Sequence, residues 1–236
     1  MIDKARKTAI ITAAGSGLGA GCARYLAKRG WQLALLARSD QVIELARELD
    51  GIAVCGDVTD ASDLRHLVDT AVEEFGTIDG AVISTGHPRK GELLGLTSQE
   101  WHTGLDLTVM PLAVLLGLLL PVFRKSGGGS IVTISSHAAV QPNRKFAVSG
   151  ALRAALSNYT RLVAREYAGD GVRINSIMPG FVDNRPIDQD WLTKIPAGRY
   201  GTVDELAGVV EFFLSDQSGY VTGQNLLVDG GLVAGI

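Results

Sequence analysis

Short apolar runs alternate with longer amphipathic stretches along the whole chain. The first run, Thr8–Thr12, has no polar face, as expected of a strand buried on both sides of a sheet. Six later runs share this character, so the predicted strands are Thr8–Thr12, Gln32–Leu36, Ala53–Cys55, Gly80–Ser84, Ser130–Ser135, Arg173–Met178 and Gln224–Val228. The pattern favours a parallel sheet of about seven strands with helices on both faces.

The stretches between these runs have helical periodicity. The predicted helices are Gly17–Arg29, Gln41–Leu49, Ala61–Phe75, Ser98–Lys125, Phe146–Tyr167 and Val203–Leu214. We expect Asp60 to cap the third helix and Pro111 to interrupt or bend the fourth. Because strand–helix–strand crossovers are right-handed, the order of elements predicts one doubly wound α/β domain over residues 1–236.

Composition narrows the class of protein. Apolar residues make up 46% and charged residues 20%, as in soluble folded domains. The net charge of −3 argues against a nucleic-acid partner. The most apolar run, Leu112–Phe123, is too short to span a bilayer, and the first is too short for a secretory signal. We expect a cytoplasmic protein with no membrane, nucleic-acid or metal partner, in which Cys22 and Cys55 are small buried residues.

A glycine-rich segment, Thr12–Gly19 (TAAGSGLG), joins the first strand to the first helix. In this context glycines let a pyrophosphate approach the backbone, and the helix start offers free N–H groups. The alternative is a tight turn that needs glycine only for its geometry. The residues expected to contact a dinucleotide here are Thr12, Gly15, Ser16, Gly17, Leu18 and Gly19.

The end of the second strand selects between dinucleotides. It reads Arg38-Ser39 and carries no carboxylate before Asp40. An arginine there accepts a 2′-phosphate, so NADP(H) is favoured over NAD(H). Asp57 and Val58 follow the third strand, where the adenine ring would lie. A solvated arginine and a plain turn aspartate are the alternatives.

Several segments together resemble the short-chain dehydrogenase/reductase family over nearly the full chain, in particular its 3-oxoacyl-ACP reductase-like members. They are Thr12–Gly19 with Ala13 in place of the first glycine, Asp57-Val58, Pro179-Gly180, Ile195–Arg199, Val221–Gln224 and Val228–Gly231. The resemblance implies a single-domain Rossmann fold and hydride chemistry on a carbonyl or alcohol substrate. It also implies nicotinamide contacts by Thr85, Gly86, Pro179, Gly180 and Val182. A homodimer or homotetramer is implied as well, paired through the apolar helix and the helix near Phe146.

The catalytic positions depart from the family pattern. Ser136 matches the active-site serine, whereas the asparagine falls on Thr108. The Tyr-x-x-x-Lys motif aligns with Phe146 and Gly150. In the family the tyrosine hydroxyl is the general acid or base, and the lysine lowers its pKa. A phenyl ring has no proton to give and glycine carries no charge, so the usual mechanism is not available.

Other side chains are candidates for the missing roles. Arg153 shares a helical face with Phe146 and Gly150, and its side chain would lean back over the space beside Gly150. His137 and His87 are candidate proton carriers, and Lys145 is a weaker one. The alternatives are an arginine facing solvent or another subunit, and ordinary loop histidines. The expected catalytic residues are Ser136, Arg153 and His137.

These features predict an NADP(H)-dependent oxidoreductase that acts on a small carbonyl or alcohol substrate by an atypical mechanism. An alternative is a catalytically inactive dinucleotide-binding protein, serving as a sensor or partner subunit. A third is another reaction on the same scaffold, such as an elimination or isomerisation, because fold does not fix function.

Overall fold

The computed structural model describes residues 6–234, in which seven parallel strands form one sheet. The strands are β1 (Thr8–Thr12), β2 (Gln32–Ala37), β3 (Ile52–Cys55), β4 (Gly80–Ile83), β5 (Gly129–Ile134), β6 (Val172–Pro179) and β7 (Asn225–Val228). Their spatial order is β3-β2-β1-β4-β5-β6-β7. The chain thus moves outward from β1 in one direction, returns, and continues from β4 in the other. The predicted doubly wound sheet is confirmed, and no strand end is displaced by more than one residue.

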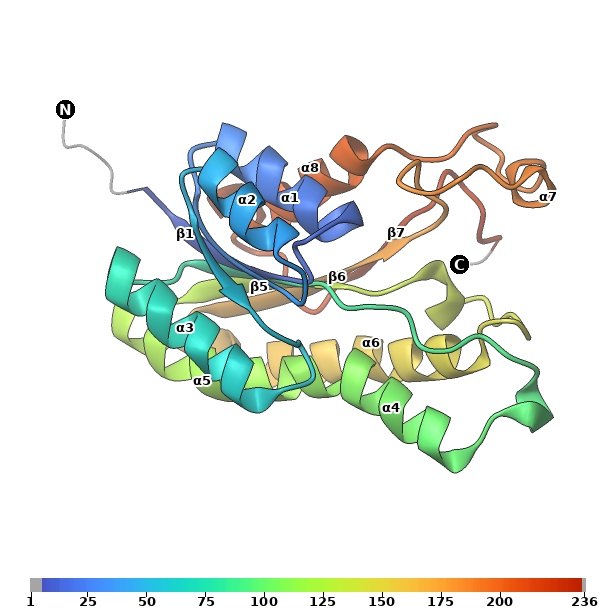
Figure 1. The fold of residues 1–236 in the computed structure, drawn as a ribbon, viewed down its shortest axis with the longest axis horizontal. Coiled ribbons are helices and arrows are strands. Elements are labelled where there is room, and N and C mark those ends of the chain that lie inside the picture. The colour runs from blue at the N-terminus through green and yellow to red at the C-terminus, as the bar shows by residue number, and fades with distance from the viewer. Residues whose placement is uncertain (1–5, 235–236) are drawn as a thin grey trace.

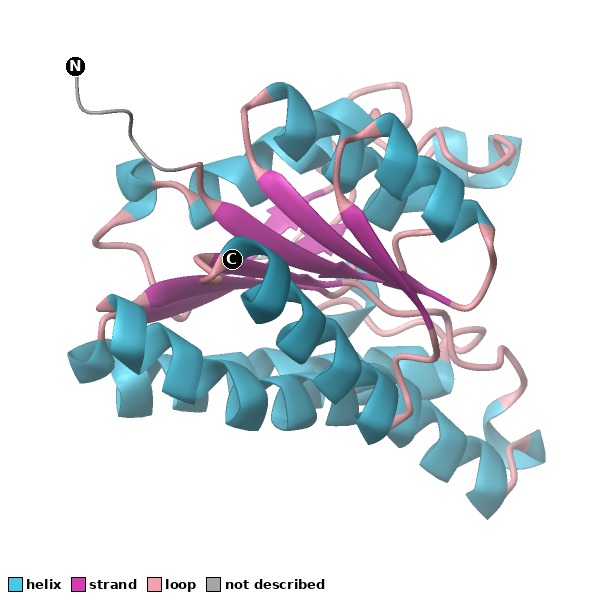
Figure 2. Ribbon diagram, turned by 60° about the vertical axis from the view of Figure 1, so that its left-hand side comes forward, coloured by secondary structure: helices cyan, strands magenta, loops and turns pink. Residues whose placement is uncertain are grey.

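Helices cover both faces of the sheet (Figure 1). One layer holds α1 (Gly17–Lys28), α2 (Gln41–Glu48) and α8 (Val203–Leu214). The other layer holds α3 (Ala61–Phe75), α4 (Ser98–Thr108), α5 (Met110–Ser126) and α6 (Ala147–Tyr167). A short α7 (Gln189–Leu192) lies in the segment after β6, where we predicted no helix. Figure 2 shows the resulting three layers from a second direction, and the arrangement is a single-domain Rossmann-like fold.

Alternation along the strands supplies two cores. Ile11, Leu33 and Leu35 belong to the apolar cluster under α1 and α8. Ile10 and Leu36 point the other way, into the cluster under α3 and α5. Because successive strand side chains face opposite sides, a strand covered by helices on both faces must be apolar at every position. This explains the unbroken apolar runs in the sequence.

The predicted helix over 98–125 is divided in two at Val109, which ends α4 and precedes α5. Pro111 lies in the first turn of α5, where its missing N–H costs no helical hydrogen bond. By length and composition alone, the combined stretch Ser98–Ser126 is long and apolar enough to cross a membrane. Its inward face is nevertheless part of the core, where Leu112, Leu119 and Phe123 are fully buried. Packing within the domain therefore accounts for the buried 33% of the apolar 18-residue window in this stretch.

The cysteine prediction is half correct. Cys22 is buried in α1, and burial raises the pKa of its thiol to about 12. Cys55, the last residue of β3, is exposed, and its thiol lies 3.5 Å from the carbonyl oxygen of Arg38. The difference arises because β3 is the edge strand of the sheet, so its final residue is not covered.

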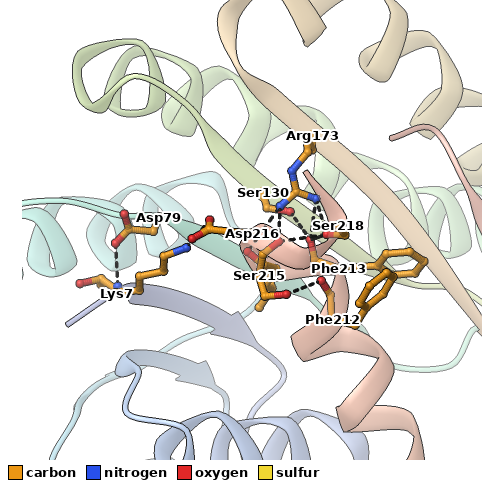
Figure 3. A network of polar contacts seen from close by, with 11 residues as sticks. Lys7, Asp79, Ser130, Arg173, Phe212, Phe213, Ser215, Asp216 and Ser218 are labelled. Carbon is orange, nitrogen blue, oxygen red and sulfur yellow. Dashed lines mark hydrogen bonds and ion pairs between the residues drawn. The ribbon is translucent and has the colours of Figure 1, made fainter. Parts of the chain in front are cut away.

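Arg173 anchors the end of α8 to the sheet (Figure 3). Its guanidinium donates to the carbonyl oxygens of Phe213, at 2.8 Å, and Ser215, at 3.0 Å. A cation at this position satisfies carbonyl groups that have no partner within the helix. Lys7 extends the network through an ion pair of 2.6 Å with Asp216. These contacts lie at the amino-terminal edge of the sheet and leave the opposite edge open for a site.

Candidate active site

A cleft of about 750 Å³ lies at the carboxyl ends of the strands, where the strand order reverses. Ligands of doubly wound sheets bind at this position because the loops on either side of the reversal diverge. The cleft is lined by every residue that the sequence assigned to catalysis or cofactor binding, with the exception of Thr12. The Thr12 hydroxyl is instead buried and donates to the carbonyl oxygen of Ser84, at 2.5 Å. Thr12 therefore ties β1 to the end of β4.

The turn after β1 fits a pyrophosphate. A Cβ atom on Gly19 would collide with the carbonyl oxygen of Ala13, so that position requires glycine. Gly17 opens α1 with a φ of +57°, a left-handed conformation that glycine adopts without strain. Ser16 caps α1 but its side chain makes no hydrogen bond to the first turn. The N–H groups at the start of α1 consequently face the cleft with no capping side chain, as an anion site requires.

The adenosine end of the cleft holds Arg38, Ser39, Asp57 and Val58. The Arg38 side chain is 80% exposed, and its Nη1 lies 3.8 Å from Oδ2 of Asp57. Oδ1 of Asp57 accepts hydrogen bonds of 2.9 Å from the backbone and hydroxyl of Thr59. Asp57 is therefore a turn aspartate that also lines the cleft. Arg38 makes only this long contact, and its guanidinium is exposed at the cleft.

The opposite end of the cleft carries the residues aligned with the catalytic motif. The hydroxyl of Ser136, which follows β5, accepts a 3.2 Å hydrogen bond from the N–H of Ala138. Phe146 caps the start of α6, and Gly150 lies one turn into it. A Cβ atom on Gly150 would lie 3.0 Å from the carbonyl oxygen of Ala138. The chain has five tyrosines, and none is followed four residues later by a lysine.

Arg153 is buried in the wall of this end of the cleft, with 3% of its surface exposed. The alternative of an arginine facing solvent is therefore excluded. Nη1 donates to the carbonyl oxygen of Ile134 at 2.6 Å, and Nη2 donates to that of Gly86 at 3.2 Å. Nε donates to Ser149, also at 3.2 Å. Burial lowers the pKa of Arg153 to about 10, so the group is still a cation at neutral pH.

His137 is held in one tautomer. Its Nδ1 lies 3.1 Å from the carbonyl oxygen of Pro179, and since a carbonyl only accepts, Nδ1 carries the proton. Burial lowers the pKa of His137, partly opposed by this hydrogen bond and by Asp229. The neutral ring thus has an accepting Nε2 atom and no proton to donate from it. This geometry suits a proton acceptor better than a proton donor.

The two remaining candidate proton carriers, His87 and Lys145, differ in their position relative to the cleft. His87 lines the cleft beside Gly86, whereas Lys145 is exposed and lies outside the cleft wall. The backbone N–H of Lys145 donates to Asn143, as in a turn. Lys90 was not among the predicted residues but lines the cleft, with its Nζ atom 5.2 Å from the centre of the Phe146 ring.

The segment after β6 supplies further residues that the sequence analysis missed. Phe181 packs against Trp191 at a ring separation of 4.7 Å and against Tyr200 at 5.4 Å, and all three line the cleft. Asn184 places its Nδ2 atom 2.9 Å from the point where a Cβ on Gly17 would lie. These residues could not be predicted, because they have no regular spacing in the sequence and reach the cleft only through the tertiary fold.

Within residues 6–234, no group of three or more His, Cys, Asp and Glu side chains is placed to hold a metal ion. The residues of the cleft do fit a dinucleotide, because the glycine turn leaves room for one. The Ser135 hydroxyl adds a further polar group, since it is buried in the cleft wall with no hydrogen-bond partner.

Comparisons with known proteins agree with this geometry. A family model described as enoyl-(acyl carrier protein) reductase matches residues 12–233. The chain is 32% identical to dehydrogenase/reductase SDR family member 4 of Pongo abelii, with 96% of this chain and 87% of the relative covered. It is 29% identical to the 3-oxoacyl-[acyl-carrier-protein] reductase FabG of Staphylococcus aureus, covering 97% and 99%.

Solved structures give the same result. L-sorbose reductase from Gluconobacter frateurii, complexed with NADPH and L-sorbose, superposes with a TM-score of 0.90 at 27% identity, covering 98% of each chain. A 7α-hydroxysteroid dehydrogenase complexed with NADH and 7-oxo glycochenodeoxycholic acid has a TM-score of 0.91 at 28% identity, covering 95% and 93%. The family match, the sheet order and the cleft agree, and the chain belongs to the short-chain dehydrogenase/reductase family of oxidoreductases.

Proposed function

We propose that this chain is an NADP(H)-dependent oxidoreductase for a small carbonyl or alcohol substrate that acts by an atypical mechanism, in which Arg153 takes the place of the usual lysine beside the retained Ser136. Arg38 and Ser39 support the choice of NADP(H), since they place a cation and a hydroxyl where a 2′-phosphate would lie. The NADPH-bound sorbose reductase is a relative that agrees with this choice. The NADH-bound steroid dehydrogenase shows that the fold accommodates either dinucleotide.

The buried guanidinium of Arg153 is the observation that carries the proposal. It restores a fixed positive charge to the end of the cleft where Gly150 leaves none. Its hydrogen bonds to Ile134 and Gly86 hold that charge at the ends of β5 and β4. A preorganised cation in a site with little water stabilises negative charge more strongly than the same cation in solution.

The chemistry of this arrangement is electrostatic. A bound nicotinamide dinucleotide would supply the hydride. In the direction of reduction, negative charge develops on the substrate oxygen, and Ser136 would donate a hydrogen bond to it, because the N–H of Ala138 occupies the accepting side of the hydroxyl. Arg153 would stabilise the same charge. The proton would come from water, and His137 would accept it in the reverse direction.

A second candidate function is a dinucleotide-binding protein without catalysis. Phe146 favours it, because a positioned general acid normally contributes about 10²- to 10⁴-fold to the rate, and the phenyl ring supplies none of this. In that case the cleft would act as a sensor or as part of a partner subunit.

We also propose that the protein forms a homodimer or homotetramer in the cytoplasm. The support is the outward face of α5 and α6, where Met110 is 41% exposed and Leu162 is 58% exposed. Sedimentation of the purified chain tests this proposal, and a monomer at micromolar concentration would contradict it.

One experiment separates the candidate functions. NADPH and NADH are titrated against the protein by fluorescence, and a panel of ketones, aldehydes and keto acids is then assayed for oxidation of the preferred dinucleotide. We expect tighter binding of NADPH and slow turnover of activated carbonyl compounds. Tight NADPH binding with no turnover would support the non-catalytic function, and binding of neither dinucleotide would overturn both.

A further inference from the structure

The end of the cleft beyond Phe146 is rich in cations. Lys90, Arg153 and Arg185 all line the cleft. All three lie close enough to His87 to repel a proton on its imidazole ring. Desolvation of the ring and this repulsion lower the pKa of His87 to about 4. Four basic side chains from three segments, the loop after β4, α6 and the segment after β6, therefore lie within electrostatic reach of one another.

Lys90 is held in this cluster by two contacts. Its Nζ atom lies 5.2 Å from the centre of the Phe146 ring, within the range of a cation–π interaction. The neighbouring Gly91 forms an isolated parallel bridge with Phe146, which fixes the loop against the start of α6. The ammonium group is thus positioned over the residue that replaces the tyrosine of the family motif.

Carboxylates do not neutralise this cluster. Among the residues that the structure describes, the cations Lys90, Arg153 and Arg185 form no ion pair within 4 Å. Of the two acidic residues that line the cleft, Asp57 lies beside Arg38 at the adenosine end. The other, Asp188, accepts the N–H of Asp190 at 2.9 Å as the cap of α7. The substrate end consequently has an excess of positive charge, which attracts anions.

We propose that the substrate carries an anionic group, a carboxylate or a phosphate, that binds between Lys90 and Arg185 beside the Phe146 ring. This inference rests on the proposed function, because it names the substrate class of the same site. Arg153 would face the reacting oxygen, and the two outer cations would bind the anionic group of the same molecule. The bound anion would replace the carboxylates that the cluster lacks.

The test uses the protein saturated with NADP⁺ and a ligand that cannot react. Oxalate is titrated as the carboxylate probe, inorganic phosphate as the phosphate probe, and oxamide as the neutral control of similar shape. Trp191 lines the cleft, so its fluorescence reports binding there. Trp191→Phe identifies the part of the signal that belongs to the cleft.

We expect oxalate or phosphate to bind and oxamide not to bind. Lys90→Met and Arg185→Gln should each weaken binding of the anion about tenfold, as expected for loss of one charge-assisted hydrogen bond. Lys145→Gln is the matched control, because it removes a cation next to Phe146 in the chain but outside the cleft, and it should leave binding unchanged. Oxalate binding without phosphate binding would assign a carboxylate, and the reverse a phosphate.

Equal binding of oxamide and oxalate, or unchanged anion affinity in Lys90→Met, would overturn the proposal. Arg185 follows Asn184, which lies against the glycine turn, so its role has a separate control. If Arg185→Gln weakened NADP⁺ binding and left oxalate binding intact, Arg185 would belong to the dinucleotide and the two-cation site would be wrong. Failure of NADP⁺ itself to bind would overturn the proposed function instead, so the two failures are distinguishable.

Discussion

Nη1 of Arg153 lies 2.6 Å from the carbonyl oxygen of Ile134, the last residue of β5. This hydrogen bond crosses from the interior of α6 to the edge of the sheet. It fixes a cation at the point where the strand gives way to the loop that carries Ser136. The position of the charge and the geometry of the loop are therefore coupled.

Replacing Arg153 should affect both stability and binding. Arg153→Met removes the guanidinium donor from the carbonyl group of Ile134 and leaves that of Gly86 with only the Thr85 hydroxyl, at a cost of about 1–3 kcal/mol in the free energy of unfolding. We expect weaker NADPH binding as well, since the loop ends move. Urea unfolding and a fluorescence titration measure the two effects. Arg153→Lys keeps the charge and should retain part of the affinity; full stability and full affinity in Arg153→Met would contradict the coupling.

Arg38 should determine the choice of dinucleotide. Its side chain is 80% exposed, so Arg38→Ala leaves folding unaffected. Loss of charge-assisted hydrogen bonds to a 2′-phosphate, at about 1.5–3 kcal/mol, corresponds to an affinity for NADPH lowered about tenfold to a hundredfold. Affinity for NADH should change little. Calorimetric titration of both dinucleotides checks this, and parallel losses for the two would exclude a phosphate site at Arg38.

Ala13 occupies a position better suited to glycine. Its φ of +49° is left-handed, a conformation that costs an L-residue about 1–2 kcal/mol. Ala13→Gly should therefore raise the free energy of unfolding by about 1 kcal/mol, net of the greater freedom of glycine in the unfolded chain. Ala151→Gly, at an exposed position in α6, is the control and should lower it by about 1 kcal/mol. A loss of stability in Ala13→Gly would show that the turn is not strained.

A tyrosine at position 146 should accelerate reduction. The ring already lines the cleft, so Phe146→Tyr adds a hydroxyl at the substrate end. Because the lysine remains absent, we expect a gain of about tenfold, less than the 10²- to 10⁴-fold of a fully tuned general acid. Single-turnover oxidation of NADPH measures the change. No gain on any reactive carbonyl compound would favour the non-catalytic function.

His87 should make folding less stable at acidic pH. Its pKa is lowered to about 4 in the folded protein from an ordinary value of 6.5. Between these values the unfolded chain binds the proton and the folded chain does not, so stability falls as pH drops from 6.5 towards 4. His87→Asn should reduce the difference in unfolding free energy between pH 7.5 and pH 5, measured in urea. His66→Asn, on the exposed side of α3, is the control; an equal effect of the two would contradict this assignment.

The fold could be predicted from the sequence because apolar and polar residues alternate with the periods of strands and helices. Strands buried on both faces gave apolar runs, and helices with one buried face gave amphipathic stretches, so the order of layers followed. The glycine turn could also be predicted from the sequence, because the local backbone geometry requires glycine at Gly17 and Gly19. The hydrogen bond from the Thr12 hydroxyl to Ser84 could not be predicted, because sequence spacing does not show which strand is adjacent.

The substrate end was less predictable for a physical reason. The place of Arg153 in the cleft wall could be predicted because Arg153 lies on the same α6 face as Phe146 and Gly150. Lys90 and Arg185 lie in separate loops, and only the tertiary fold brings them to one cleft. The prediction that Cys55 is buried was wrong for a related reason. Its exposure follows from the position of β3 at the sheet edge, which depends on the order of all strands.

The close approach of Gly150 to Ala138 also bears on how the family motif could be built into this chain. A side chain at 150 would begin 3.0 Å from the carbonyl oxygen of Ala138, so the loop after Ser136 would have to give by a few tenths of an ångström. A lysine at 150 would also bring a second cation to a wall that already holds the guanidinium of Arg153. A tyrosine at 146 meets neither obstacle, so the two halves of the motif differ in how readily this backbone accepts them.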